Sequence, residues 1–109
     1  MLTKRKSEQN KIIKHIEEKI ELNLKINISE LEKLLELNYE IVFEYNGDNY
    51  EIIQYRNYIE LHYNCFYANN KTNSLYYTKF TNPKELIDNA KICDKKIAEI
   101  INEIKIISF

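Results

Sequence analysis

The sequence predicts an α+β fold in which a small antiparallel β-meander of three to five strands packs against amphipathic helices. Apolar residues recur at three- and four-residue spacing near both ends of the chain, as they do on amphipathic helices. Between residues 39 and 80, aromatic and β-branched residues alternate with polar ones, which is typical of strands. We therefore expect one domain over residues 1–109, with an added N-terminal helix within residues 1–27. Residues 28–109 then form a helix–β-meander–helix–helix core.

The first helix is predicted from a single apolar stripe near the N-terminus. Ser7 or Asn10 can cap it. The stripe consists of Ile12, Ile13, Ile16 and Ile20. In residues 22–29, LNLKINIS, the apolar residues alternate with polar ones instead, which is strand periodicity. Two alternatives stay open, because either the helix continues to about residue 24 or a short strand follows it.

A second helix is predicted to begin at Ser29. In the stretch SELE, Ser29 is the expected N-cap and Glu32 the third helical residue, which are the two positions of a capping box. Asn38 can end this helix, because asparagine tolerates the left-handed conformation that is common just after a helix. The buried face is expected to consist of Leu31, Leu34 and Leu35.

Four strands are predicted at about residues 40–46, 49–56, 58–66 and 75–80, with the polar residues 68–74 as a loop between the last two. Gly47 is the only glycine in the chain, and it follows Asn46 between the first two strands. Such a pair indicates a type I′ hairpin turn, which requires positive φ at both central residues. A turn at Asn46-Gly47 pairs Phe43 with Tyr50, whereas a turn one residue later pairs Tyr45 with Tyr50. Both registers give the same two faces.

Two more helices are predicted after the meander. Asn82 is the expected N-cap of the first, with Pro83 at the first helical position and Glu85 at the third. Its apolar side is formed by Leu86, Ile87 and Ala90. Asp94 is the expected cap of the second, whose stripe consists of Ile97, Ile100, Ile101 and Ile104. Residues 105–109 form either a short strand or a packed tail.

The strand alternation separates a core face from a candidate binding face. The core face consists of Ile41, Phe43, Tyr45, Tyr50, Ile52 and Gln54, with Ile59, Leu61, Tyr63 and Cys65 from the third strand. The candidate partner-binding residues lie on the other face and are Glu40, Glu44, Glu51, Tyr55, Tyr58, Glu60 and His62. Tyrosine suits interfaces because it buries a large area and keeps a hydroxyl free for bonding. The alternatives are an ordinary sheet surface, because strands prefer aromatic and β-branched residues, and a face that helices cover as core.

The sequence contains no pattern that marks catalysis. One glycine cannot form a glycine-rich phosphate loop, and the common hydrolase, zinc-protease and calcium-loop motifs do not occur. His62 and Cys65 are three residues apart, so on a strand they point to opposite faces. We expect Cys65 and Cys93 to be free thiols rather than a disulfide. We therefore predict a protein that is not an enzyme and that has no catalytic, cofactor-binding or metal-binding residues.

Charge is distributed unevenly along the chain. The net charge is −1, but residues 1–25 carry +3, residues 26–60 carry −6 and residues 61–109 carry +2. The acidic middle favours a basic protein partner, although solvated helix faces also produce such blocks. The same acidity disfavours direct nucleic-acid binding by the tyrosine-rich sheet. We expect no membrane span and no signal peptide, hence a cytoplasmic protein, and the first helix could instead pack on a second copy in a homodimer.

A resemblance to known proteins rests on three stretches: ISELEKLLELNYEIVFEYNGDNYEI, FTNPKELIDNAKI and KKIAEIINEIKIIS. Together they resemble small proteins encoded by bacteriophages and mobile elements of AT-rich bacteria, a group that includes anti-CRISPR and other anti-defence proteins. The resemblance covers roughly residues 28–108. It implies a phage-type inhibitor that binds a host defence protein, such as a nucleic-acid-binding effector complex. Two alternatives are a sponge for a nucleotide signal and a regulator that binds nucleic acid or neutralises a toxin.

Overall fold

The computed structural model describes residues 2–63, 66–68, 71–73 and 76–109, with side chains described for residues 10–63 and 76–109. The helices are α1 (Leu2–Glu21), α2 (Ile28–Glu36), α3 (Pro83–Asn89), α4 (Ile97–Ile100) and the 3₁₀ turn η1 (Ile101–Glu103). The strands are β1 (Ile41–Tyr45), β2 (Asp48–Gln54), β3 (Ile59–Tyr63), β4 (Phe66–Ala68), β5 (Lys71–Asn73), β6 (Tyr76–Phe80), β7 (Lys91–Ile92), β8 (Lys95–Lys96) and β9 (Lys105–Ser108).

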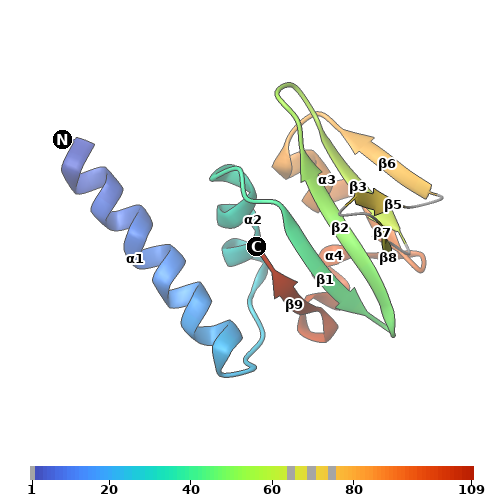
Figure 1. The fold of residues 1–109 in the computed structure, drawn as a ribbon, viewed down its shortest axis with the longest axis horizontal. Helices are drawn as coiled ribbons and strands as arrows, with labels where there is room; N and C mark the ends of the chain where they lie inside the picture. Colours follow the sequence, from blue (N-terminus) through green and yellow to red (C-terminus); the bar gives the residue numbers. More distant parts are fainter. Residues whose placement is uncertain (1, 64–65, 69–70, 74–75) are drawn as a thin grey trace.

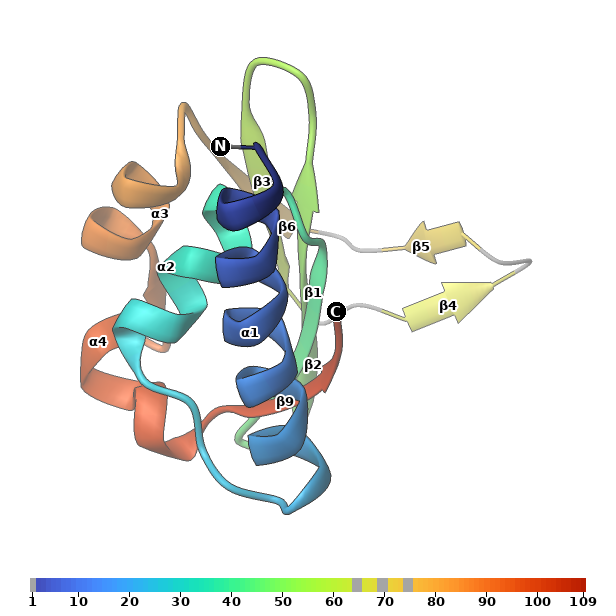
Figure 2. The same ribbon diagram turned by 90° about the vertical axis from the view of Figure 1, so that its left-hand side faces the viewer.

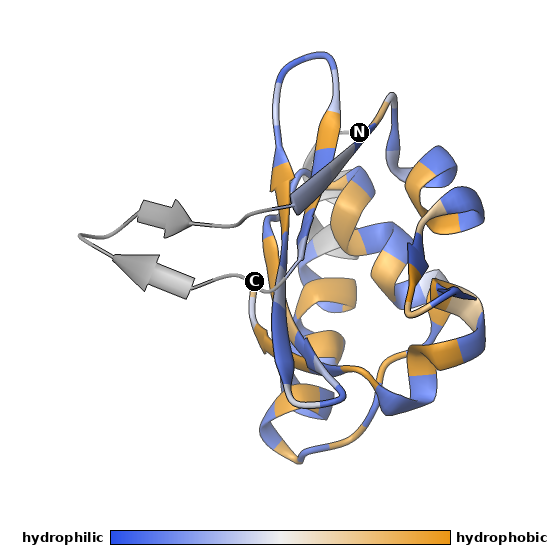
Figure 3. Cartoon of the chain, turned by 90° about the vertical axis from the view of Figure 1, so that its right-hand side faces the viewer, coloured by the Kyte–Doolittle hydropathy of each residue, from blue (hydrophilic) through white to orange (hydrophobic). Residues whose placement is uncertain are grey.

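A five-stranded antiparallel sheet with the order β6-β3-β2-β1-β9 is the centre of the fold, which confirms the α+β prediction (Figure 1). Helices α2, α3 and α4 lie on one side of this sheet, and the β4–β5 hairpin extends from the other (Figures 2 and 3). Residues 105–108 form an edge strand beside β1, which settles the open question about the C-terminal segment in favour of a strand.

The core lies between the sheet and the helices. The predicted core face of the hairpin is confirmed, because its five apolar residues are buried. From the sheet, the core contains Ile41, Phe43, Tyr45, Tyr50, Ile52, Ile59 and Leu61, and from the helices Leu31, Leu34, Leu35, Leu86, Ile87, Ile97 and Ile100. The half-buried Gln54 side chain donates to the backbone carbonyls of Leu35 and Tyr39, at 3.0 and 3.3 Å, so the sheet is also tied to the end of α2.

Helix α1 begins earlier than predicted. It starts at Leu2, so Ser7 and Asn10 lie inside it, and both capping predictions are wrong. The residues before Ser7 include lysine and arginine, which are good helix formers, and contain no glycine or proline to stop the helix. Helix α1 ends at Glu21, and neither alternative for the following residues holds, because residues 24–27 are neither helix nor strand. Asn23 has a φ of 59°, a left-handed conformation that ends the helix.

Helix α1 packs against α2 and lies near β9 at one end of the molecule (Figures 1 and 2). Ile16 is fully buried in the common core. The Nζ of Lys19 donates to Oε1 of Glu30 at 2.7 Å, and Nε2 of His15 lies 3.5 Å from Oε2 of the same residue. The apolar stripe of α1 and a cluster of polar contacts around Glu30 therefore attach this helix to the rest of the fold, because the partly buried Ile12, Ile13 and Ile20 also pack against the core.

The N-cap of α2 is Asn27 and not Ser29. The Asn27 side chain accepts from the backbone N–H of Glu30 at 2.8 Å, and the Glu30 carboxylate accepts from the backbone N–H of Asn27 at 2.9 Å. This is the capping box that the sequence placed two residues later. The difference has a physical reason, because the earlier start makes Ile28 helical and brings Glu30 within reach of Lys19. Asn38 has a φ of 66°, as expected for the residue that ends the helix.

The β1–β2 hairpin has the first of the two predicted registers. Asn46 and Gly47 have φ values of 54° and 84°, as a type I′ turn requires. Phe43 pairs with Tyr50, and their rings stack with centroids 5.3 Å apart. The turn therefore fixes the register that places the aromatic rings of both strands in the core.

Two short hairpins were not predicted. Residues 68–74 were expected to form a loop, but residues 66–68 and 71–73 pair as β4 and β5. The second hairpin, β7–β8, turns at Cys93 and Asp94, whose φ values are 53° and 64°. Asp94 therefore belongs to a turn and does not cap a helix. Helix α4 begins at Ile97 with Lys96 at the N-cap, and the backbone N–H of Lys96 donates to Glu99 at 3.2 Å.

The start of α3 agrees with the prediction. Asn82 accepts from the backbone N–H of Glu85 at 2.9 Å, and Pro83 occupies the first helical position. The predicted stripe of the last helix is also buried, although it spans α4, η1 and the residue after them. Cys93 is an exposed free thiol in the turn between β7 and β8. Cys65 and Asn64 lie outside the described residues.

Candidate protein-binding face

The helices leave one face of the five-stranded sheet uncovered (Figures 2 and 3). We call it the open face. It consists of Val42, Glu44, Glu51, Ile53, Tyr55, Tyr58, Glu60, His62, Tyr77 and Lys79, which the strand register places on one side of the sheet; on β1 and β2 they alternate with buried residues. The alternative in which helices also cover this face is therefore wrong. Every predicted site residue lies on it except Glu40, which borders it just before β1.

A row of side chains crosses one end of the open face. Tyr55 and Tyr58, from the two sides of the β2–β3 turn, stack with ring centroids 4.6 Å apart and an interplanar angle of 14°. Lys79 on β6 places its Nζ 4.2 Å from the centroid of the Tyr58 ring, a cation–π contact. Beyond Tyr55, Oε2 of Glu40 accepts from the backbone N–H of Gln54 at 3.1 Å. The β2–β3 turn itself is closed by a hydrogen bond from the Tyr55 N–H to the Tyr58 carbonyl at 2.9 Å.

Glu60 lies between this row and a second pair of rings. His62 stacks on Tyr77 with centroids 5.3 Å apart, and its Nε2 lies 3.0 Å from Oε1 of Glu60. The Tyr55 hydroxyl also hydrogen-bonds the Glu60 carboxylate. Burial, followed by the charge of Glu60 and this hydrogen bond, raises the pKa of the Tyr55 hydroxyl. Glu60 therefore connects the two ring pairs into one network.

The burial of Glu60 changes its expected role. Only 8% of its surface is exposed, so it organises the rings and is not a surface acid that a partner would meet first. Glu44 and Glu51 are half-exposed, and the strand register places Glu51 opposite His62 and Glu44 opposite Lys105. The acids that remain accessible to a partner are therefore those of β1 and β2, together with the exposed Glu40.

Sequence reasoning missed two residues of the open face, Tyr77 and Lys79. Both belong to β6, which pairs with β3 and places Tyr77 opposite His62 and Lys79 opposite Glu60. The signal was present, because two-residue strand periodicity places Tyr77 and Lys79 on the face opposite Phe80, which is buried. Tyr77 is 58% exposed, so it extends the aromatic surface to the edge of the sheet.

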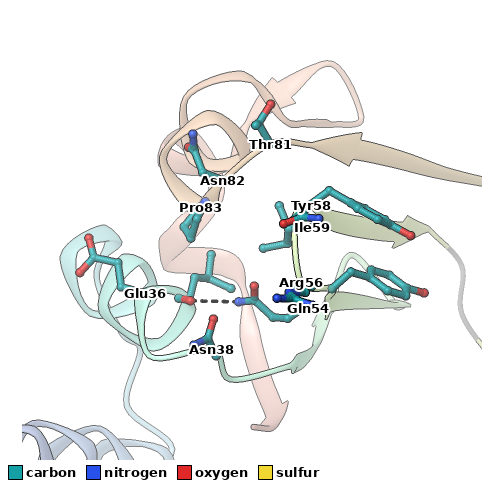
Figure 4. A pocket seen from close by; sticks show the side chains of 12 residues that line it. Glu36, Asn38, Gln54, Arg56, Tyr58, Ile59, Thr81, Asn82 and Pro83 are labelled. Atoms are coloured by element: carbon teal, nitrogen blue, oxygen red, sulfur yellow. Dashed lines mark hydrogen bonds between the residues drawn. The ribbon is translucent and has the colours of Figure 1, made fainter.

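A pocket of about 390 Å³ adjoins the row, between the β2–β3 turn, the end of α2 and the start of α3 (Figure 4). Its lining is mostly polar and includes Glu36, Asn38, Gln54, Arg56, Asn57 and Asn82. The Gln54 amide nitrogen points toward α2, where it donates to the Leu35 carbonyl (Figure 4), and Thr81 and Asn82 line the cavity at the start of α3. The pocket offers hydrogen-bonding groups and one guanidinium to a small polar molecule.

Three comparisons with known proteins gave no match, whether to a family model, a curated protein or a solved structure. Within the described ranges, no three or more His, Cys, Asp or Glu side chains are grouped as a metal site would require. None of the helices in the part of the chain that the structure describes is both long and apolar enough to traverse a lipid bilayer.

Proposed function

We propose that this chain is a small non-enzymatic binding protein that contacts another protein through its open face. One observation carries the proposal: the face that the helices leave uncovered holds a network of stacked rings. These rings are Tyr55 on Tyr58 and His62 on Tyr77, and Glu60 is hydrogen-bonded between the pairs. Uncovered aromatic surface of this kind is enriched at protein interfaces.

The network also prepares the face for binding. A side chain that is ordered on binding loses rotamer freedom, and this loss opposes association. Here the Tyr58 ring is already held between the Tyr55 ring and the Lys79 ammonium group, and His62 is held by Glu60 and Tyr77. The open face therefore offers rings whose positions are fixed before a partner arrives.

The partner that this face suits is a protein with a basic surface. Glu40, Glu44 and Glu51 supply accessible or half-exposed carboxylates, which attract a basic partner and orient it. The resemblance of residues 28–108 to anti-defence proteins of phages favours a host defence protein in the cytoplasm as that partner. In this proposal the chain acts as a stoichiometric inhibitor by covering a basic channel or an assembly surface of its target.

Charge reversal on the open face tests the proposal. The double variant Glu44→Lys, Glu51→Lys is compared with Glu17→Lys, Glu103→Lys, which makes the same charge change at exposed sites on α1 and η1. The unmodified protein is immobilised and used to capture a partner from extracts of a bacterium with an AT-rich genome. The affinity of the isolated partner for the unmodified protein and for each variant is then measured by titration. We expect the open-face variant to bind at least about tenfold more weakly while its circular dichroism spectrum is unchanged. Equal affinities for the two variants would remove the open face as the binding surface.

A second candidate function is the binding of a nucleotide signal in the pocket beside the β2–β3 turn. Its volume of about 390 Å³ falls in the range of small-molecule sites, and Arg56 offers a charge complementary to phosphate. Thermal unfolding in the presence of a panel of nucleotides measures this directly. A stabilisation that Arg56→Ala abolishes supports the sponge function, and no stabilisation by any nucleotide counts against it.

A further inference from the structure

We propose that the outer ring face of Tyr55, bordered by Glu40, receives the guanidinium group of an arginine from the partner protein. The inference rests on the proposed function and specifies the chemistry that the partner brings to the open face. It concerns one end of the row Lys79, Tyr58, Tyr55 and Glu40, which follows the strand order β6-β3-β2-β1 across the sheet.

The other end of the same row already holds a cation. Lys79 lies 4.2 Å from the Tyr58 ring centroid, and the Tyr58 ring is stacked on Tyr55. Tyr58 can cover only one face of Tyr55, and the strand order directs the second face toward the β1 side of the sheet. Tyr55 is 44% exposed, so this second face is accessible. The protein therefore fills one end of a two-ring stack with its own ammonium group and leaves the equivalent position on Tyr55 open to solvent.

The electrostatic surroundings of Tyr55 favour a cation at that position. After burial, the negative charges of Glu60 and Glu40 contribute to the raised pKa of the Tyr55 hydroxyl, so both carboxylates act on this ring. Oε2 of Glu40 accepts from the Gln54 N–H, which holds the carboxylate in place beside the sheet. A cation over Tyr55 would gain the attraction of the ring and of two carboxylates together.

Arginine fits this site better than lysine or a nucleobase. A guanidinium group is planar, so it can stack on the flat ring while its edge donates to a carboxylate. An ammonium group is compact and strongly hydrated, and it gains less from such a surface. A nucleobase could also stack on Tyr55, but its phosphate would be repelled by Glu40 and Glu60.

The full chain can be titrated with three peptides that differ in one side chain. The probes are an arginine–glycine hexapeptide, its lysine counterpart and its citrulline counterpart, in which the guanidinium is replaced by a neutral group of the same shape. Tyrosine ring resonances are followed by NMR. We expect the arginine peptide to shift the Tyr55 ring saturably and to bind about two- to fivefold more tightly than the citrulline peptide. Equal binding of the citrulline or lysine peptide would overturn the inference.

Variants localise the effect and control for loss of structure. Tyr55→Leu and Glu40→Gln should each weaken binding of the arginine peptide, and Tyr55→Phe, which keeps the ring, should weaken it less than Tyr55→Leu does. Tyr76→Leu is the matched control, because Tyr76 is 65% exposed on β6 and lies on the opposite side of that strand from Lys79. Weakening by Tyr76→Leu equal to that by Tyr55→Leu would also overturn the inference.

Failure of this inference can be distinguished from failure of the proposed function. If Glu44→Lys, Glu51→Lys weakens the captured partner but Tyr55→Leu and Glu40→Gln do not, the open face is the interface and the arginine site is wrong. If the arginine peptide binds at Tyr55 while none of the open-face variants affects the captured partner, the cation site is real and the proposed interface is wrong.

Discussion

Replacing Asn27 by alanine tests which residue caps α2. Asn27→Ala removes the 2.8 Å hydrogen bond that its side chain accepts from the Glu30 N–H. Loss of an N-cap side chain destabilises proteins by about 0.5–2 kcal/mol, and Asn27 is exposed, so water replaces part of the bond. We therefore expect a loss of about 1 kcal/mol.

Ser29→Ala is the matched control, because Ser29 is the cap that the sequence pattern alone favours. In the structure Ser29 is exposed and helical, at the second position of α2. Alanine has a higher helix propensity than serine by a few tenths of a kcal/mol, so this variant should be as stable as the unmodified protein or slightly more stable.

Thermal unfolding followed by far-ultraviolet circular dichroism separates the two variants. For a chain of 109 residues the unfolding entropy is about 230 cal/mol/K, so 1 kcal/mol corresponds to a fall in Tm of about 4 °C. Asn27→Ala should show this fall, and Ser29→Ala should not. A larger loss in Ser29→Ala than in Asn27→Ala would refute the assignment of the cap and of the capping box.

Two further predictions concern the β1–β2 hairpin. Gly47→Ala should destabilise the fold by about 1–2 kcal/mol, because alanine is strained at the left-handed φ of 84°. A Cβ at this position would meet no atom within 4 Å, so a steric clash adds nothing to this loss. An unchanged urea midpoint would contradict the turn assignment. Burial, followed by nearby negative charges, raises the pKa of Tyr50 to about 12, so the folded state holds this proton more tightly than the unfolded chain, whose tyrosine pKa is about 10. The stabilisation, about 2–3 kcal/mol, is complete below the unfolded value and is lost as the pH rises from about 10 through 12. Tyr50→Phe should flatten this alkaline decline in the urea midpoint, and an equally steep decline in the variant would show that another group causes it.

Local signals in the sequence predicted turns and helix starts correctly where the backbone conformation strongly favours one residue type. Gly47 follows Asn46 between two alternating runs, and the turn has the expected φ values. Asn82 precedes Pro83, the only proline in the sequence, and it is the N-cap of α3, as expected for a proline at the first helical position. Around α2 the pattern was degenerate, because Asn27 and Ser29 each have a glutamate three residues later. The choice between them depended on Lys19, which reaches Glu30 from a different helix.

The candidate site was predicted in outline but not in its chemistry. Strand alternation placed Glu44, Glu51 and Tyr55 on one face, because that period is local. The position of β6 beside β3 depends on non-local pairing, so the contacts of Tyr77 and Lys79 could not be deduced. The burial of Glu60 likewise depends on the rings that surround it, which a pattern of residue types does not specify.

The pairing of β9 with β1 has a consequence for the order of folding. Phe43 pairs with Tyr50 across a separation of 7 residues (50 − 43) and with Ile106 across 63 (106 − 43). Closing the longer loop costs about 2 kcal/mol more in chain entropy, so the meander can nucleate before β9 arrives. Until then β1 is an unprotected edge strand, on which a second chain could pair. The short strand β9 therefore pairs last and covers the exposed edge of β1. If this pairing is slow, the newly made protein is prone to aggregate through that edge.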